Sequence, residues 1–154
     1  MEFKKADLTH LDEITEIWKD FFDFHQALNP FFTRSDQAEN IFRSFIFSEM
    51  KNENSLLAVA LKQNKVMGYV LARINFYPPV FKNPLYCQIT DIVLVEKERG
   101  KGEGKKLFEQ VVFWCREKNI SRIELQVLPQ NTKAWSFYQK LGFKEFLSTL
   151  AFTI

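Results

Sequence analysis

A glycine-rich turn at residues 99–104 is the segment of this sequence best suited to chemistry. It reads Arg-Gly-Lys-Gly-Glu-Gly and lies between the apolar run 92–95 and a helical pattern of apolar residues. Such a turn supplies the first amides of a helix, which are unpaired and carry partial positive charge. Glycine lets a bulky anion come close to the backbone. The turn therefore predicts a phosphate-binding cradle.

Two common phosphate-binding motifs do not fit this turn. A P-loop would need glycine at position 99 and Ser or Thr at position 106, where Arg99 and Lys106 stand. The dinucleotide-binding pattern would need its last glycine at Lys105 or at Leu107, depending on the starting glycine. Taken alone, the turn could equally be an ordinary strand-to-helix connection.

A second motif downstream favours the phosphate-binding cradle over an ordinary connection. It has the form N-x-x-A-x-x-F-Y-x-x-L-G-F, with fixed residues Asn131, Ala134, Phe137, Tyr138, Leu141, Gly142 and Phe143. Together with the R-x-x-G-x-G pattern of Arg99, Gly102 and Gly104, it resembles the GNAT superfamily of acetyltransferases. The resemblance covers about 89–143, and the first 80 residues resemble the family only in their layout.

The resemblance implies an acetyl-CoA-dependent N-acetyltransferase with acetyl-CoA as co-substrate. Its acceptor would be a primary amine of a small molecule, or of a protein or peptide, attacking directly in a ternary complex. One alternative is a catalytically silent acyl-CoA-binding regulatory module on the same fold. A nucleotide-binding domain without acyl chemistry fits the second motif poorly.

Hydrophobic periodicity and turn signals set the expected elements. Strands are expected at 2–6, 55–62, 66–76, 85–95 and 122–128, and helices at 9–28, 35–50, 102–118 and 131–141. Residues 77–84 contain three prolines and are expected to form a loop, and residues 143–154 one or two final strands.

This order predicts an α/β (α+β) fold in one domain, residues 1–154. The resemblance makes it a GNAT fold, with a mixed, mostly antiparallel central sheet of six to seven strands and helices on both faces. The fourth and fifth strands are expected to be parallel because a helix joins them. In the family these two strands splay apart.

The resemblance also assigns a cofactor site. The pyrophosphate of CoA would lie on the amides of Arg99, Gly100, Lys101, Gly102, Glu103 and Gly104. Lys101, Lys105 and Lys106 could add positive charge, or could be solvated surface lysines. The pantetheine arm would pair with the backbone of Ile92, Val93 and Leu94. Asn131 would cap its helix or contact the cofactor.

Three residues are expected to be catalytic. The amide of Leu94 would polarise the thioester carbonyl. Tyr138 would protonate the departing thiolate, since a phenol is protonated at neutral pH. Asp91 is the first candidate for the general base, with Glu124 and His25 weaker, although a β-bulge would change which face Asp91 occupies. Water could also serve as the proton path.

Aromatic side chains in the N-terminal half form the expected acceptor side. They could hold an amine through cation–π contacts, or could be core plus a dimer surface. Phe31, Phe32, Tyr77 and Phe81 lie in expected loops and are the preferred acceptor-binding residues. No acidic cluster or motif identifies the acceptor.

Composition limits the remaining classes. The chain has 154 residues, 46% apolar and 26% charged, with a net charge of +2. That charge gives no sign of a nucleic-acid or membrane partner. No membrane-length apolar run or apolar signal core is present, so a cytoplasmic protein is expected. The two cysteines stand in apolar runs and are expected to be buried thiols. No metal is expected, and a homodimer is compatible with the sequence.

Overall fold

Strands and helices follow the expected order up to the last helix. The computed structural model describes residues 1–154. The strands are β1 (Glu2–Lys5), β2 (Ser55–Lys62), β3 (Lys65–Phe76), β4 (Leu85–Leu94) and β5 (Ile123–Leu125). The helices are α1 (Leu11–Leu28), α2 (Ala38–Lys51), α3 (Glu103–Glu117) and α4 (Thr132–Lys140).

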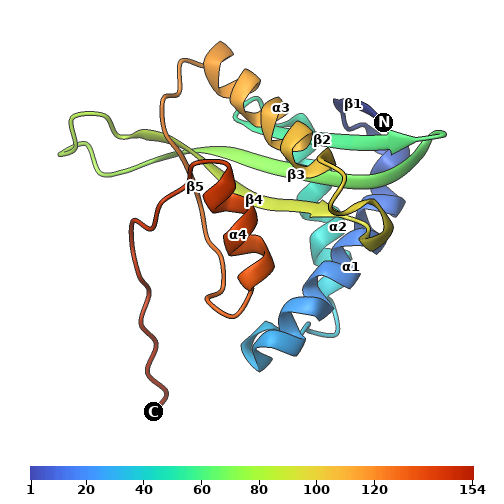
Figure 1. The fold of residues 1–154 in the computed structure, drawn as a ribbon, viewed down its shortest axis with the longest axis horizontal. Coiled ribbons are helices and arrows are strands. Elements are labelled where there is room, and N and C mark those ends of the chain that lie inside the picture. The colour runs from blue at the N-terminus through green and yellow to red at the C-terminus, as the bar shows by residue number, and fades with distance from the viewer.

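One twisted sheet organises the molecule (Figure 1). Its strand order is β1-β2-β3-β4-β5, antiparallel throughout except for the parallel pair β4 and β5. α3 forms the crossover that a parallel pair requires. The mixed, mostly antiparallel sheet and its parallel pair at strands 4 and 5 are therefore confirmed.

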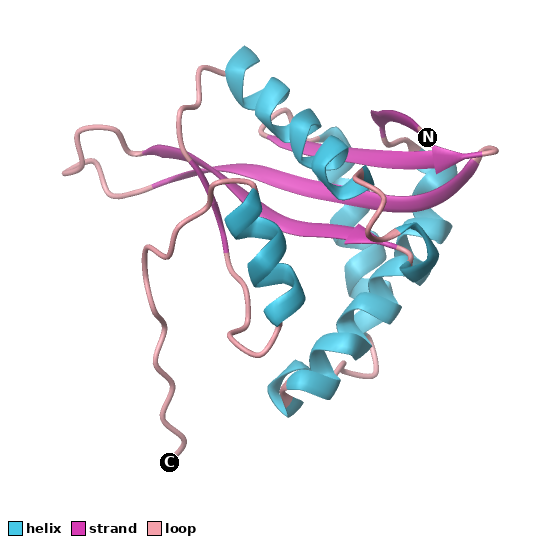
Figure 2. Ribbon diagram, in the orientation of Figure 1, coloured by secondary structure: helices cyan, strands magenta, loops and turns pink.

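Helices cover both faces of the sheet, as Figure 2 shows. α1 and α2 pack on one face, where the buried core includes Trp18, Phe42 and Tyr69. α3 packs on the other face, whose core includes Val70 and Leu107. Alternation along β3 sends Tyr69 and Val70 to opposite faces, so a single strand contributes to both cores.

Both cysteines lie in the second core. Cys87 on β4 and Cys115 on α3 are buried and unbridged, as the sequence predicted.

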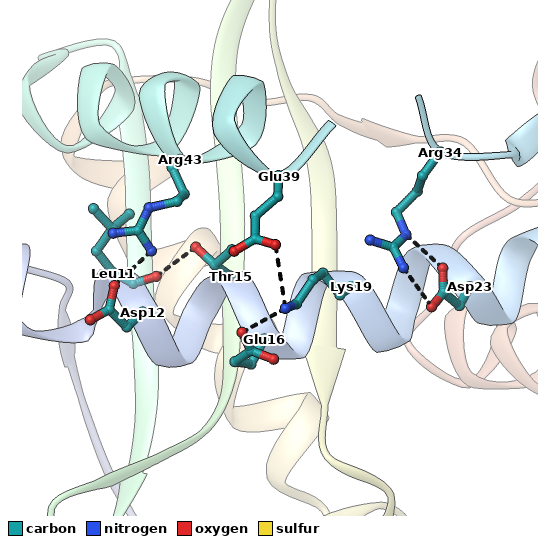
Figure 3. A network of polar contacts seen from close by, with 9 residues as sticks. All are labelled: Leu11, Asp12, Thr15, Glu16, Lys19, Asp23, Arg34, Glu39 and Arg43. Carbon is teal, nitrogen blue, oxygen red and sulfur yellow. Dashed lines mark hydrogen bonds and ion pairs between the residues drawn. The ribbon is translucent and has the colours of Figure 1, made fainter. Parts of the chain in front are cut away.

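α1 and α2 are joined by aromatic stacking and by ion pairs. The Trp18 and Phe42 rings stack with centroids 4.1 Å apart. Figure 3 shows the polar side of the same helix pair, where Arg43 Nη1 lies 2.6 Å from Asp12 Oδ1. Exposed ion pairs add little stability, so the stacked rings are the stronger connection.

The expected six to seven strands are wrong: the sheet has five. β5 extends over only three residues instead of 122–128, and residues 143–154 form no strand. A strand forms only where an edge offers backbone partners. The short β5 offers few, and the segment between α4 and the C-terminus runs away from it (Figure 1).

Candidate active site

The turn before α3 presents a row of free amides. Gly100 and Gly102 have φ angles of +75° and +83°, which glycine adopts without strain. Gly102 is the N-cap of α3, and no side chain caps this end. The amide of Arg99 donates to Glu96, whereas the amides of residues 100–104 have no partner within the protein. Five free amides at a helix start are suited to bind phosphate.

Gly104 serves a different purpose from the two glycines before it. A Cβ at this position would lie 3.2 Å from the Phe137 ring and 3.7 Å from Leu94 Cδ1. Gly104 therefore lets α3, α4 and β4 meet closely. This contact connects the two sequence motifs in space.

A buried carboxylate anchors the same turn. Glu98 is buried, and its oxygens lie 2.9 Å from Lys62 Nζ and 3.2 Å from Lys101 Nζ. These two hydrogen bonds lower the pKa of Glu98. The side-chain ammonium of Lys101 is thus paired with Glu98, and Lys101 contributes only its backbone amide to the row of free amides.

The other lysines of the turn also have acidic neighbours. Lys106 Nζ lies 3.3 Å from Glu103, and Lys105 Nζ lies 3.9 Å from Glu109. All three lysines considered for phosphate binding are therefore paired, which leaves the backbone amides as the principal positive feature.

One edge of β4 is unpaired where the sheet divides. β5 pairs with β4 only at residues 87–89. Val95 N–H donates to Met67 on β3, and Val93 is opposite Tyr69, so both point toward β3. Alternation then directs the backbone groups of Ile92 and Leu94 toward the side that β5 has left.

The three β4 residues that were expected to pair with the pantetheine arm do not all face the gap. Ile92 and Leu94 present their backbone groups to the gap, whereas Val93 pairs with β3 and buries its side chain against α1 and α2. The Leu94 carbonyl accepts a 2.9 Å hydrogen bond from Arg99 Nε. Arg99 therefore ties the turn to the free edge of β4.

A β-bulge settles the orientation of Asp91. Leu71 is opposite Asp91 and Ala72 is opposite Ile89, so Thr90 is the extra residue. Because the bulge precedes Asp91, this side chain shares the α1/α2 face with Val93. The Tyr69 hydroxyl on that face donates a 3.1 Å hydrogen bond to Asp91 Oδ2.

Burial changes the acidity of the residues around Asp91. Desolvation raises the pKa of Asp91 to about 6, although the hydrogen bond from Tyr69 opposes the shift. Burial, and next the charge of Asp91, raises the pKa of Tyr138. Asp91 and Tyr138 are therefore electrostatic neighbours, although they come from different elements.

α4, which carries Tyr138, lies beside the dividing strands β4 and β5 (Figure 1). Asn131 Oδ1 accepts a 3.2 Å hydrogen bond from the Ala134 amide, so Asn131 is the helix cap. The Tyr138 ring packs near Phe137 and Phe143, with centroids 5.2 and 5.7 Å away.

The other two candidate bases, Glu124 and His25, already make hydrogen bonds within the protein. Glu124 accepts hydrogen bonds from the Tyr77 hydroxyl at 2.7 Å and from Arg122 Nε at 2.5 Å. His25 Nδ1 lies 2.8 Å from the Phe21 carbonyl, and its ring packs on the Phe21 ring. Both fit structural roles better than Asp91 does.

The four expected acceptor-binding residues do not form one cluster. Phe31 and Phe32 lie in the turn after α1 with ring centroids 5.3 Å apart, and Phe31 is 86% exposed. Tyr77 and Phe81 lie in the β3–β4 loop, also 5.3 Å apart. Figure 1 shows this loop and the α1–α2 connection at different ends of the molecule.

Sequence reasoning missed Tyr69, Tyr86 and Glu98. Tyr69 was hidden in an apolar strand, although its hydroxyl is the one polar tip in the run 66–72. Tyr86 stacks on Tyr77 with centroids 4.6 Å apart. The run of charged residues 96–98 directly before the glycine turn is the sequence signal that points to Glu98.

The chain shows neither a metal-binding cluster nor a membrane-spanning helix. No group of three or more His, Cys, Asp or Glu side chains is arranged to hold a metal ion. None of the helices has the length and apolar character needed to span a bilayer.

Comparison with known proteins gives consistent matches. The model of the acetyltransferase (GNAT) family matches residues 11–143. An uncharacterized N-acetyltransferase of Archaeoglobus fulgidus is 26% identical over 139 residues, covering 90% of this chain and 89% of that protein. Some matches are partial, and the chain spans 24% of the length of one N-acetyltransferase from Bacillus subtilis.

Solved structures share the whole fold. The tetramutant of the BH1408 protein from Bacillus halodurans has a TM-score of 0.90 at 22% identity, with both chains fully covered. A predicted acetyltransferase with acetyl-CoA from Clostridium acetobutylicum has a TM-score of 0.78 at 18% identity, covering 99% of this chain and 95% of that one.

Proposed function

The chain belongs to the acetyltransferase (GNAT) family, and from that premise we propose a specific reaction and site. The protein transfers the acetyl group of acetyl-CoA to a primary amine of a small molecule, or of a protein or peptide. The amine attacks directly in a ternary complex. The observation that carries this proposal is the row of free amides at residues 100–104 beside the unpaired edge of β4.

Acetyl-CoA supplies the acetyl group as a thioester. The free amides of residues 100–104 bind its pyrophosphate, because helix-initial amides attract anions. The edge of β4 at Ile92 and Leu94 pairs with the amide groups of the pantetheine arm. This arrangement extends the sheet through the gap that β5 leaves.

Leu94, Tyr138 and Asp91 carry out the chemical step. The Leu94 amide donates to the thioester oxygen as negative charge develops there. The amine nitrogen forms a bond to the acetyl carbon and loses a proton to Asp91, directly or through water. The carbon–sulfur bond breaks, and the Tyr138 hydroxyl gives its proton to the departing thiolate.

The directions of the pKa shifts suit these roles. With its pKa near 6, Asp91 is mostly ionised at neutral pH yet more basic than an ordinary carboxylate. The raised pKa of Tyr138 keeps its hydroxyl protonated before the reaction. Tyr69 is a positioning residue, since its hydroxyl holds Asp91 on the α1/α2 face.

The acceptor approaches from the α1/α2 face, toward which Asp91 points. Phe31 and Phe32 form one candidate wall, and Tyr77 and Phe81 form another. Because these walls lie at different ends of the molecule, a small amine would use one of them and a peptide could use both (Figure 1).

Turnover of an amine panel tests the function. Free thiol released from acetyl-CoA is measured with small amines, polyamines and peptide N-termini. Thiol release that requires a particular amine supports the proposal. Binding of acetyl-CoA without turnover of any amine would point to a silent regulatory module, and binding of ATP or NAD in its place would contradict the cofactor assignment.

A further inference from the structure

A cavity beside the β2–β3 hairpin is surrounded by lysine side chains. Its volume is about 360 Å³, and it is lined by Lys62, Gln63, Lys65, Met67, Lys97 and Glu98. The proposed acetyl transfer assigns no bound group to this cavity. Its charged lining therefore needs an explanation of its own.

Two of these lysines lie directly opposite each other. Lys62 on β2 is paired with Lys65 on β3. The two connecting residues, 63–64, have φ angles of +52° and +61°, which is typical of a tight two-residue hairpin. Leu61 and Val66 point into the α1/α2 core, so alternation sends both lysines to the other face of the sheet. Like charges in such a pair are destabilising, and the tight turn keeps them together.

The positive charge around the cavity exceeds what its one carboxylate can balance. Glu98 is buried and is shared between Lys62 Nζ at 2.9 Å and Lys101 Nζ at 3.2 Å. Neither Lys65 nor Lys97 forms an ion pair with an acidic side chain. Four ammonium groups thus meet one carboxylate. The chain as a whole has a net charge of only +2, so this excess of positive charge is local.

A small molecule with a phosphate group has the chemistry that this cavity lacks. A phosphate monoester carries close to two negative charges at neutral pH and has three strong acceptor oxygens. Lysine binds phosphate as a point charge, and a cavity of this volume can hold a small metabolite. A long polyanion fits poorly, because Glu13 lies at the same hairpin, where it accepts a 2.8 Å hydrogen bond from the Val66 amide.

The cavity and the proposed cofactor gap lie on opposite sides of β4. The sheet order places β3 and β2 on one side of β4 and β5 on the other (Figure 1). The proposed pantetheine site is on the β5 side, whereas Lys62 and Lys65 lie at the β2–β3 hairpin. A phosphate group held by these lysines would therefore not occupy the place of the cofactor.

We propose that this cavity is a second anion site, which binds a small phosphate monoester other than acetyl-CoA. Lys65 and Lys97 are its principal ligands, because their ammonium groups have no partner within the protein. Lys62 contributes from its ion pair with Glu98. The site does not depend on the proposed acetyl transfer.

Amide chemical shifts of the ¹⁵N-labelled protein during a titration with glycerol 3-phosphate test the site. The titration is made at constant ionic strength, both without acetyl-CoA and at saturating acetyl-CoA. We expect saturable shift changes at residues 62–65 and 97–98 in both conditions, with the same affinity. Titration with chloride alone should leave these amides unchanged.

The double variant Lys65→Gln/Lys97→Gln removes the two unpaired charges without breaking an ion pair. It should weaken the binding of glycerol 3-phosphate by about tenfold or more, because each lysine supplies a charge to the phosphate. The matched control Lys82→Gln/Lys144→Gln removes the same charge from two exposed lysines elsewhere and should bind as wild type does. No saturable change at residues 62–65 and 97–98, or equal weakening in the control, would overturn the proposal.

Acetyl-CoA and its 3′-dephospho analogue distinguish the two sources of a phosphate monoester. The ratio of their affinities should be the same in wild type and in Lys65→Gln/Lys97→Gln. A smaller ratio in the variant would assign these lysines to the 3′-phosphate of the cofactor and overturn a separate site. Loss of glycerol 3-phosphate binding at saturating acetyl-CoA would do the same. A protein that binds glycerol 3-phosphate but not acetyl-CoA would support this site and contradict the proposed function.

Discussion

The proposed cofactor side and the proposed acceptor side of this protein are built in different ways. The cofactor side consists of backbone groups, namely the free amides at residues 100–104 and the edge of β4. The acceptor side consists of aromatic side chains in two separate turns. Backbone recognition depends on a few glycines and a helix start, whereas side-chain recognition can vary freely in sequence.

The largest expected effects come from the residues that move protons between these two sides. Tyr138→Phe removes only the hydroxyl, so kcat should fall about 100-fold under conditions where chemistry limits the rate. Acetyl-CoA affinity should change little, since the lost interaction develops with charge on sulfur. Tyr86→Phe is the matched control and should retain kcat. Full kcat in Tyr138→Phe would mean that Tyr138 is not the general acid.

Asp91 should govern the pH profile. With a pKa of about 6, its carboxylate is ionised above that pH and protonated below it. The value of kcat/KM should therefore fall as the pH drops through 6, and Asp91→Asn should lose this limb together with about 100-fold of activity at pH 7. The engaged carboxylate of Glu124 provides the control variant Glu124→Gln, which should keep the limb. An unchanged limb in Asp91→Asn would exclude Asp91 as the base.

A substitution pair at Gly102 separates charge from conformation on the cofactor side. Asn and Asp both tolerate the left-handed φ at this position better than other side chains, and they have nearly the same shape. Gly102→Asp should bind acetyl-CoA at least tenfold more weakly than Gly102→Asn, because its charge faces the pyrophosphate. Equal calorimetric affinities for the two folded variants would mean that no phosphate binds at this turn.

The acceptor side should give the smallest effects. For a peptide acceptor, Phe31→Ala, Phe32→Ala and Tyr77→Ala should each raise the KM of the acceptor about threefold, with less change for acetyl-CoA. For a small amine, we expect the effect at one wall only. If acceptor kinetics are unchanged in all three variants, these aromatic residues are structural.

The elements of the proposed cofactor side could be predicted from the sequence, whereas the separation of the aromatic residues proposed for the acceptor could not, for physical reasons. The glycine turn and the Tyr138 motif act through local geometry, so their spacing is visible in the chain. The bulge at Thr90 that orients Asp91 leaves no such pattern, because it arises from the pairing of β4 with β3.

The strand prediction for the end of the chain was wrong for the opposite reason. Residues 143–154 have a clear strand pattern, but a strand also needs a neighbouring edge, which sequence periodicity cannot supply. The split of the acceptor aromatics between two ends of the molecule was likewise invisible, since it depends on the path of the whole chain.

Amide chemical shifts of the ¹⁵N-labelled protein during an acetyl-CoA titration test the central claim most directly. The account predicts the largest shift changes at residues 100–104, at Ile92 and at Leu94, with little change at Phe31 and Phe32. Shift changes confined to other parts of the molecule, or none at saturating acetyl-CoA, would contradict the assignment of the cofactor to the free amides before α3 and the open edge of β4.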